Sequence, residues 1–182
     1  GWTTVDADGD GHCWQIATSG HATLYGKKIA ISYTSNPDNG KDYDGTQDNW
    51  LITPQINVTN DQFTVSYMCC AEDLNSKEYY ELLVSETGTA PADFTHKLTA
   101  ETLDNGYEDD PVKNNHSFSL KAFKGKKIYI AFRHHQAASY ALGIDDVKVS
   151  NLAGPKAPTN LTATAGTDGA SVVLKWKNAS AT

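Results

Sequence analysis

An acidic segment near the start of the chain, residues 6–11, has the composition of a cation-binding loop. Asp6, Asp8 and Asp10 occupy every second position, and a glycine follows each of the last two. Like charges at this spacing repel one another, and a hard cation relieves the repulsion. Calcium accepts about six to eight oxygens in variable geometry, whereas magnesium requires an octahedron and keeps its waters. The spacing therefore favours calcium over the alternative interpretation, a solvated acidic turn closed by glycines.

The same segment matches an EF-hand loop only in part. The three aspartates fall at its positions 1, 3 and 5, and His12 can offer its backbone carbonyl at position 7. Position 12 is Ala17 in place of the bidentate Glu, and no amphipathic helix precedes or follows the loop. We therefore expect a cation-tied loop in a β protein, which takes its remaining ligands from elsewhere in the chain.

Short alternating runs bounded by Gly, Asn, Asp and Pro predict the elements that position this loop. They are typical of an all-β sandwich or barrel, and helical patterns are scarce. The predicted strands are residues 28–33, 50–54, 62–70, 79–85, 126–132 and 141–149. Pro54 is expected at a strand end, because proline cannot donate to a sheet. The polar stretches 34–49, 101–115 and 133–140 are predicted as loops, where recognition usually occurs.

The last predicted strand of this series contains a break in its alternation. Leu142 and Ile144 have even parity, whereas Val147 and Val149 have odd parity, so the pattern slips at Asp145-Asp146. A slip of one residue indicates a β-bulge, and bulges re-aim side chains next to functional sites. These two carboxylates are candidate ligands for the acidic loop if the first and last strands are neighbours.

The composition of the 182 residues limits the classes of partner. The 15 Lys and Arg residues against 22 Asp and Glu residues give a formal net charge of −7, which argues against nucleic acid. Residues 152–182 contain three lysines and one aspartate, so the preceding residues carry 12 basic and 21 acidic side chains, a charge of −9. Such a surface suits cations, basic partners or neutral sugars.

Other sequence features bear on compartment and chain organisation. No apolar run approaches a membrane span, and no signal segment opens the chain. The chain starts at Gly1 without Met and stops inside a pattern, so we expect it to be part of a longer protein.

Cys69 and Cys70 are adjacent in a predicted strand and face opposite sides, so they cannot both meet one partner. We interpret at least two of the three cysteines as small, buried hydrophobic residues.

After residue 151 the composition changes to a linker rich in Gly and Pro. Residues 160–164 and 171–176 then predict two strands with Trp176 as an aromatic anchor. About thirty residues cannot bury a core of their own. We therefore expect the beginning of a second β-sandwich.

Four separated segments together resemble the cleaved-adhesin domains of the gingipain and haemagglutinin proteins of a periodontal bacterium. They are residues 1–11, Asn49-Trp50-Leu51-Ile52-Thr53-Pro54, Ala131-Phe132-Arg133-His134 and Gly143-Ile144-Asp145-Asp146-Val147. The resemblance covers about residues 1–150. The tail from Pro158 to Trp176 resembles the start of a fibronectin type III-like module.

This resemblance implies a jelly-roll β-sandwich with calcium-tied loops over residues 1–151, and a linker with the first strands of a truncated fibronectin III-like module over 152–182. It implies that the domain is one of several in tandem in a large secreted polyprotein. Such domains are cut from the polyprotein and stay attached to the bacterial outer surface. The implied role is adhesion, haemagglutination, haemolysis and virulence. The implied partners are haemoglobin, matrix proteins of the fibrinogen and fibronectin type, the erythrocyte surface and neighbouring adhesin domains. The protease centre of such polyproteins lies in a different domain, so this chain is not expected to be an enzyme.

The resemblance also implies a set of site residues. The calcium ligands carry over to Asp6, Asp8 and Asp10 with a carbonyl near His12, joined by Asp145 or Asp146, and Asp48 is a further candidate. For partner binding, Arg133, His134, His135 and Tyr140 combine a cation, imidazoles and an aromatic ring. Strand alternation sends the two histidines to opposite faces, and the alternative is a buried Arg or His that ties a loop.

Rival functions can be weighed against the same residues. The sequence has no G-x-S-x-G elbow, H-E-x-x-H helix or phosphate-binding glycine loop, and Cys13 beside His12 is a poor candidate for a catalytic dyad. A glycosidase needs two carboxylates facing one sugar, which the many acidic residues leave open. A calcium-stabilised carbohydrate-binding module is the main alternative. It would require two or three aromatic side chains exposed on one face.

Overall fold

The computed structural model describes residues 1–18, 28–41, 43, 47–73, 77–103, 115–135, 140–151, 159–167 and 170–177. The chain divides into two compact units, Gly1–Ser150 and Asn151–Thr182. No helix within these ranges is long and apolar enough to cross a membrane.

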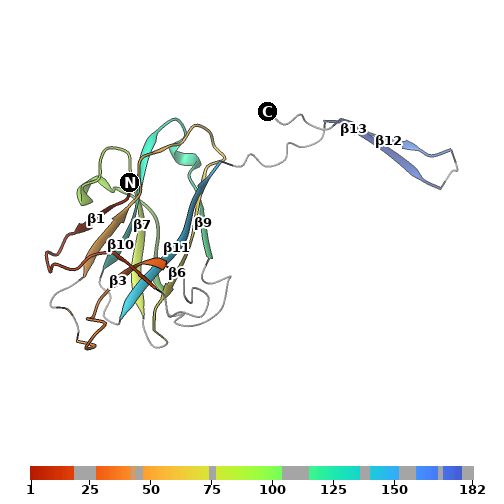
Figure 1. Ribbon diagram of the computed structural model, residues 1–182. Coiled ribbons are helices and arrows are strands. Elements are labelled where there is room, and N and C mark those ends of the chain that lie inside the picture. Colours follow the sequence, from red (N-terminus) through yellow and green to blue (C-terminus); the bar gives the residue numbers. More distant parts are fainter. Residues whose placement is uncertain are drawn as a thin grey trace. The chain divides into compact units, whose positions relative to one another are not determined.

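The first unit is a sandwich of two antiparallel β-sheets (Figure 1). The first sheet has the order β1 (Thr3–Asp6), β4 (Asp48–Ile52), β10 (Lys127–His135), β7 (Glu78–Ser85) and β8 (His96–Leu103), and β5 (Ile56–Asn57) also pairs with β10. The second has the order β2 (Gln15–Thr18), β3 (Lys28–Tyr33), β11 (Ala141–Ser150), β6 (Thr64–Ala71) and β9 (Asn115–Ser119). The short 3-10 helices η2 (Pro91–Asp93) and η3 (Lys121–Phe123) lie in connections. The all-β sandwich predicted from the alternating runs is confirmed.

The core lies between the sheets and follows the alternation in the sequence. Tyr67 of β6 packs edge-to-face on Phe132 of β10 at 4.8 Å between ring centroids, and its hydroxyl lies 2.8 Å from the hydroxyl of Tyr80 on β7. All three side chains are buried. Cys69 joins this inner cluster, whereas Cys70 packs on the outer face of the second sheet. Neither buried cysteine forms a disulfide.

The observed strand bounds correct several expectations. β10 continues through Arg133, His134 and His135, which the sequence assigned to a loop, because these residues pair with β4 and β7. The sequence did not predict β1, β2, β5, β8 and β9, because these strands are short or mostly polar and carry little apolar signal. Of the expected loop 101–115, residues 101–103 and 115 belong to strands, and 104–114 lie outside the described residues.

The β-bulge predicted at Asp145-Asp146 is present in β11. The register of β11 against β6 shifts between Asp145 and Lys148, and Asp146 has a φ of 51°. The shift keeps Ile144 and Val147 on the same inner face despite their opposite parity. It also leaves two consecutive carboxylates at the point where the strand bends.

The second unit consists of a two-stranded antiparallel hairpin, β12 (Thr159–Ala165) and β13 (Val172–Lys177). Its large apolar side chains are exposed, with Val172 at 67% and Trp176 at 54%. A hairpin alone is marginally stable in water. That it begins a fibronectin III-like module stays a prediction.

Gly143 in β11 is required by close packing on the outer face of the second sheet. A Cβ atom at this position would lie 2.5 Å from Oε1 of Glu72 and 2.8 Å from Cδ1 of Ile29. We expect Gly143→Ala to lower the free energy of unfolding by about 1–3 kcal/mol, measured by urea denaturation. Gly1→Ala, where no heavy atom lies within 4 Å, is the control. Equal stability of the two variants would contradict this assignment.

Candidate metal centre and partner-binding face

The acidic loop follows β1 directly and is folded back by its own backbone. Gly9 and Gly11 have φ values of 75° and 84°, a region that glycine adopts at little cost. Their N–H groups donate to the two carboxylate oxygens of Asp6, at 2.7 and 2.9 Å. One oxygen each from Asp6, Asp8 and Asp10 then lies within 4.8 Å of the others. Among the described residues, this is the one group of three such side chains that close together.

Contacts with the start of β4 hold the loop in place. The Ala7 N–H donates to the Asp48 carbonyl at 3.0 Å, and the Gln47 amide donates to Oδ2 of Asp10 at 3.2 Å. The His12 ring stacks on Tyr43 at 3.6 Å between centroids. Nothing in the sequence indicates that Gln47 and Tyr43 contact this loop, because both lie in a polar stretch without periodicity.

The electrostatics of the loop favour a bound cation. Burial, with the neighbouring carboxylate of Asp6, raises the pKa of Asp8 to about 6. Burial also acts to raise the pKa of Asp6, but hydrogen bonds from Asp8 and from backbone N–H groups outweigh it and lower that pKa. Within the described ranges, no lysine or arginine forms an ion pair with these carboxylates. The donor set is therefore concentrated and hard, which fits calcium.

The other predicted ligands are not brought to this cluster. Both carboxylate oxygens of Asp48 accept hydrogen bonds from Arg133, at 2.6 and 2.8 Å, so its side chain is already occupied. Asp145 and Asp146 belong to the other sheet and line a pocket with Trp2. Trp2 precedes Asp6 by four residues, about 13 Å along an extended strand. The premise that the first and last strands are neighbours does not hold, because β1 and β11 lie in different sheets.

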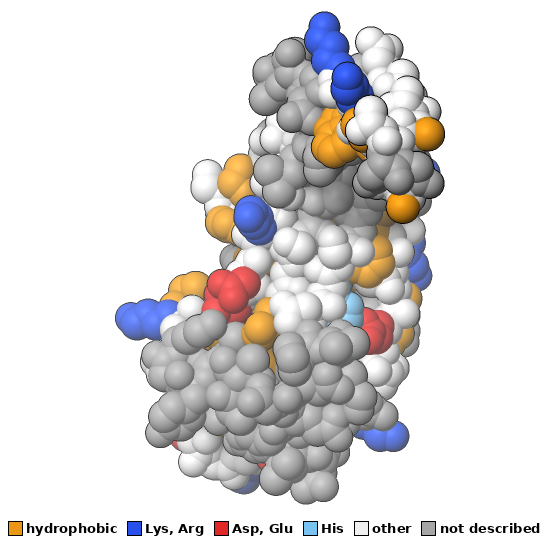
Figure 2. Space-filling view, turned by 90° about the vertical axis from the view of Figure 1, so that its right-hand side faces the viewer, with side chains coloured by type: hydrophobic (Ala, Val, Ile, Leu, Met, Phe, Trp, Pro, Cys, Tyr) orange, Lys and Arg blue, Asp and Glu red, His pale blue; other side chains and the backbone are white. Residues whose placement is uncertain are grey.

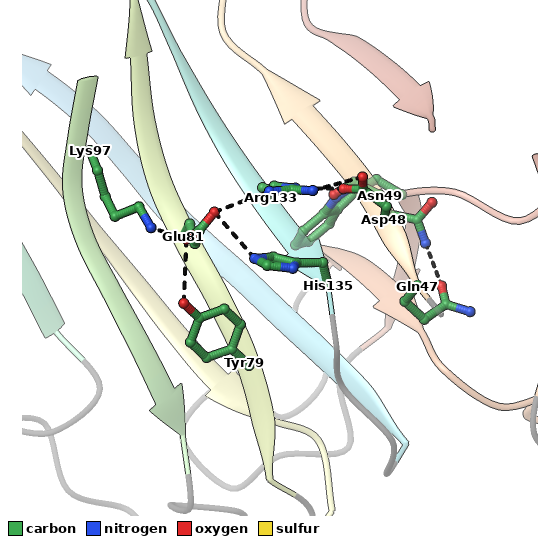
Figure 3. A network of polar contacts seen from close by, with 9 residues as sticks. Gln47, Asp48, Asn49, Tyr79, Glu81, Lys97, Arg133 and His135 are labelled. Atoms are coloured by element: carbon green, nitrogen blue, oxygen red, sulfur yellow. Dashed lines mark hydrogen bonds and ion pairs between the residues drawn. The ribbon is translucent and has the colours of Figure 1, made fainter. Parts of the chain in front are cut away.

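The outer face of the first sheet carries a ladder of paired charges around Glu81 (Figure 3). Its carboxylate pairs with Lys97 on β8, accepts from the Tyr79 hydroxyl and lies 3.3 Å from Nη1 of Arg133 and 3.2 Å from Nε2 of His135. Arg133 then links this group to Asp48 on β4. The guanidinium also lies 5.0 Å from the ring centroid of Trp50, which is 3% exposed. Beside the ladder is an open pocket of about 430 Å³, lined by Trp50, Phe94, Lys97 and Arg133 among others.

The four predicted partner-binding residues therefore occupy different environments. Arg133 is partly exposed within the ladder, and His135 is 7% exposed beneath it. His134 points into the core and is fully buried, so it cannot contact a partner at the surface of this fold. The two histidines face opposite sides, as the alternation predicts. The half-buried Tyr140 ties a connection, since its N–H donates to Glu78 and its carbonyl accepts from Thr34.

His134 belongs to a buried hydrogen-bond network between the sheets. Its Nδ1 lies 2.9 Å from the Ser32 hydroxyl and its Nε2 lies 3.0 Å from Glu78. The Asn49 amide donates to Ser32 and also to Gln47, whose own amide reaches Asp10. The interior of the sandwich is thus connected to the acidic loop by side-chain hydrogen bonds.

Comparison with known proteins identifies this arrangement of sheets. The sequence model of the Cleaved Adhesin Domain matches residues 1–149, which is nearly all of the first unit. The chain belongs to the cleaved adhesin family. The domain is accordingly adhesin-like, and it is homologous to the non-catalytic cleaved adhesin modules of gingipain and haemagglutinin polyproteins.

Relatives of this cleaved adhesin domain are much longer proteins. It is 34% identical over 165 residues to Hemagglutinin A of Porphyromonas gingivalis, covering 82% of this chain and 8% of that protein. It is 28% identical over 156 residues to Gingipain R1 of the same organism, covering 81% of this chain and 9% of the relative. The chain thus spans less than a tenth of the length of either relative.

Solved structures agree with the fold. The K1 cleaved adhesin domain of Lys-gingipain from P. gingivalis W83 superposes with a TM-score of 0.68 at 28% identity, over 84% of this chain and 91% of that one. The K3 domain gives 0.64 at 26% identity, over 82% and 90%. A complex of TmCBM61 with β-1,4-galactotriose gives 0.54 at 12% identity, over 83% and 88%, which shows a common fold alone.

The Glu81 ladder is expected to make this cleaved adhesin domain acid-labile. Burial, reinforced by the charge of Arg133, lowers the pKa of His135 from its ordinary 6.5. The contribution of the neutral His135 to the free energy of unfolding is therefore fully present above about pH 6.5. It is lost as the pH falls through the pKa of His135 in the folded state. For Glu81, burial raises the pKa, but Lys97, His135 and Arg133 outweigh it and lower the pKa below the ordinary 4.5. The contribution of the ionised Glu81 to the free energy of unfolding is thus present above pH 4.5 and is lost as the pH falls below it.

Urea unfolding between pH 8 and pH 3 measures both effects. His135→Gln should flatten the loss that begins near pH 6.5, and Glu81→Gln should reduce the loss below pH 4.5. Glu86→Gln changes a carboxylate outside the ladder and is the control. Identical pH profiles for all variants and the parent chain would show that the ladder does not set the acid response.

Proposed function

We propose that this domain is an adhesin and haemagglutinin module of a secreted protease polyprotein held at the bacterial outer surface. It binds host proteins, namely haemoglobin, fibrinogen and fibronectin-type matrix proteins, and the erythrocyte surface, and it contributes to haemolysis and virulence. The observation that carries the proposal is the family match across the whole first unit, together with relatives named Hemagglutinin A and Gingipain R1.

The shape of the domain suits binding rather than chemistry. Two sheets packed through a dense aromatic core form a rigid support, and the outer face of the first sheet presents an open pocket beside partly exposed charged groups. Asp48, Arg133 and Glu81 fix one another in position, so a partner would meet a preorganised polar surface. Preorganisation of this kind lowers the entropy cost of association.

We also propose a role for neighbouring modules of the same polyprotein. The second unit exposes Leu161, Val172 and Leu174, which are 67%, 67% and 53% accessible. Exposed hydrophobic side chains are visible next to charged ones in the space-filling view (Figure 2). Further strands of a fibronectin III-like module, or an adjoining adhesin domain, would cover such residues.

Calcium is the proposed structural cofactor of the acidic loop. Asp6, Asp8 and Asp10 would hold it with a backbone carbonyl near His12, and the convergence of the three carboxylates supports this set. A bound ion would neutralise the loop and hold its backbone in one conformation. Because Gln47 contacts both Asp10 and Asn49, this ordering would extend to the buried network. Its role is structural, since it holds the loop against the start of β4.

The carbohydrate-binding alternative receives less support. Stacking on sugars requires aromatic faces that are open to solvent. Trp14 and Trp50 are 6% and 3% exposed, and Arg133 covers the ring of Trp50. In the described part of the first unit, Trp2 is the one tryptophan with substantial exposure, at 46%.

The adhesin function is tested by saturable binding of the full chain to immobilised haemoglobin, to immobilised fibrinogen and to washed erythrocytes. An unrelated acidic β-sandwich protein of similar size is the control for charge. We expect concentration-dependent binding to at least one of the three surfaces above that control. Binding equal to the control on all three would reject the proposal, and selective binding to a glycan array would favour the carbohydrate alternative.

The calcium proposal is tested by thermal melts in calcium and in chelator, with the metal content measured on the same sample. A ligand that binds only the native state stabilises it by ~2.7 kcal/mol at a hundred times its dissociation constant. We therefore expect chelator to lower the melting temperature, Asp8→Asn to abolish the calcium-dependent shift, and Asp61→Asn, a distant exposed carboxylate, to preserve it. An unchanged melt in excess chelator would count against a metal in this loop.

A further inference from the structure

The two sheets leave an apolar opening along one side of the sandwich, which we call the seam. It is lined by Trp2 of the segment leading into β1, by Ile16 of β2 and by core residues behind them, among them Leu51, Ile144 and Val147. Its volume is about 340 Å³, within the range of ligand pockets, which begins at about 300 Å³. Trp2 is 46% and Ile16 is 70% exposed, whereas Leu51 and Ile144 are buried at its floor. Exposed apolar side chains therefore stand at the entrance of a pocket whose inner lining belongs to the core.

The seam lies between two edge strands. β1 ends the order of the first sheet and β2 ends the order of the second, so within the described residues each has a neighbour on one side only. An edge strand presents backbone N–H and C=O groups that an extended chain can pair with. An exposed isoleucine on such an edge is unusual, because edges are normally protected by charge or cover. This combination suits an extended peptide better than a compact ligand.

The rim of the seam is acidic. Asp145 and Asp146 of the β11 bulge line it, against one lysine, Lys28. The first 151 residues carry 21 acidic and 12 basic side chains, so the wider field is also negative. This charge favours a cationic partner and disfavours an anionic membrane or a polyanion.

We propose that the seam binds an extended peptide segment in which apolar side chains alternate with Lys or Arg. An apolar side chain enters between Trp2 and Ile16, the peptide backbone lies along the edge of β1 or of β2, and a basic side chain meets Asp145. The inference rests on the proposed adhesin function, to which it adds a surface and a class of partner. It requires no metal and no residue of the Glu81 ladder.

The test is a fluorescence-anisotropy titration of the full chain with a labelled, acetylated and amidated heptapeptide that alternates lysine with valine and leucine. We expect saturable binding that Ile16→Glu weakens at least tenfold. Because Ile16 is largely exposed, this change should leave the far-ultraviolet circular dichroism and the melting temperature unaltered. Leu161→Glu makes a matched change of charge and polarity at an equally exposed residue of the second unit and should bind like the parent chain. The variant Asp145→Asn should weaken binding and reduce its salt dependence.

Variants of the peptide separate the expected contacts. A peptide with serine in place of valine and leucine, or with glutamate in place of lysine, should bind at least tenfold more weakly. N-methylation of alternate backbone amides should also weaken binding, since it removes the donors that pair with a strand edge. Equal binding of the Lys-Ser peptide, or equal binding by Ile16→Glu, would overturn the proposal. So would Ile16-dependent binding of a small apolar dye without any binding of the peptide.

The outcome is independent of the test of adhesin function. Ile16-dependent peptide binding without binding to haemoglobin, fibrinogen or erythrocytes would reject the adhesin proposal and leave the seam as a peptide site. Host-protein binding that survives Ile16→Glu, with no peptide binding, would reject the seam and leave the adhesin proposal standing.

Discussion

A buried chain of hydrogen bonds between the two sheets constrains the rest of this domain. Ser32 of the second sheet lies within hydrogen-bond distance of both Asn49 and His134 of the first, and His134 continues to Glu78. A buried polar group left without its partner costs about 1–3 kcal/mol, so these contacts penalise any sliding of one sheet over the other. Apolar packing alone would tolerate more positions, because it is not directional. The network therefore fixes the relative register of the sheets.

The position of the acidic loop follows from that register. Asn49 pairs with Asp6 across the strands, and Asn49 and Gln47 together connect the core to Asp10. The loop is thus attached to an element whose own place is set by the buried network. Glycine at two left-handed positions lets the backbone close around Asp6, and the three carboxylates converge as a result. The close approach of the three carboxylates is therefore supported by Gln47 and Asn49, which lie outside the loop.

Two surfaces of the sandwich have opposite chemical character. On the outer face of the first sheet, Asp48, Glu81, Lys97 and Arg133 pair with one another, so the surface is polar, ordered and nearly neutral. At the seam, the apolar side chains of Trp2 and Ile16 are exposed and the rim is acidic. The first surface is stabilised by its own ion pairs, whereas the second leaves apolar area accessible to solvent. Exposed apolar area is the stronger driving force for association, which is why we assign peptide binding to the seam.

The sequence by itself determined the all-β class, the central strands, the bulge at Asp145-Asp146 and the acidic cluster. These features depend on side-chain alternation and on charges within a few residues of one another, which are local properties. The sequence did not determine which strand ends meet, and so Asp48 proved to bind Arg133, His134 proved to be buried, and Asp145 and Asp146 proved to lie along the seam. It also gave no sign of Gln47 as a contact of Asp10. Only the tertiary structure decided these pairings, because they depend on the order of strands in two sheets and on how the sheets pack.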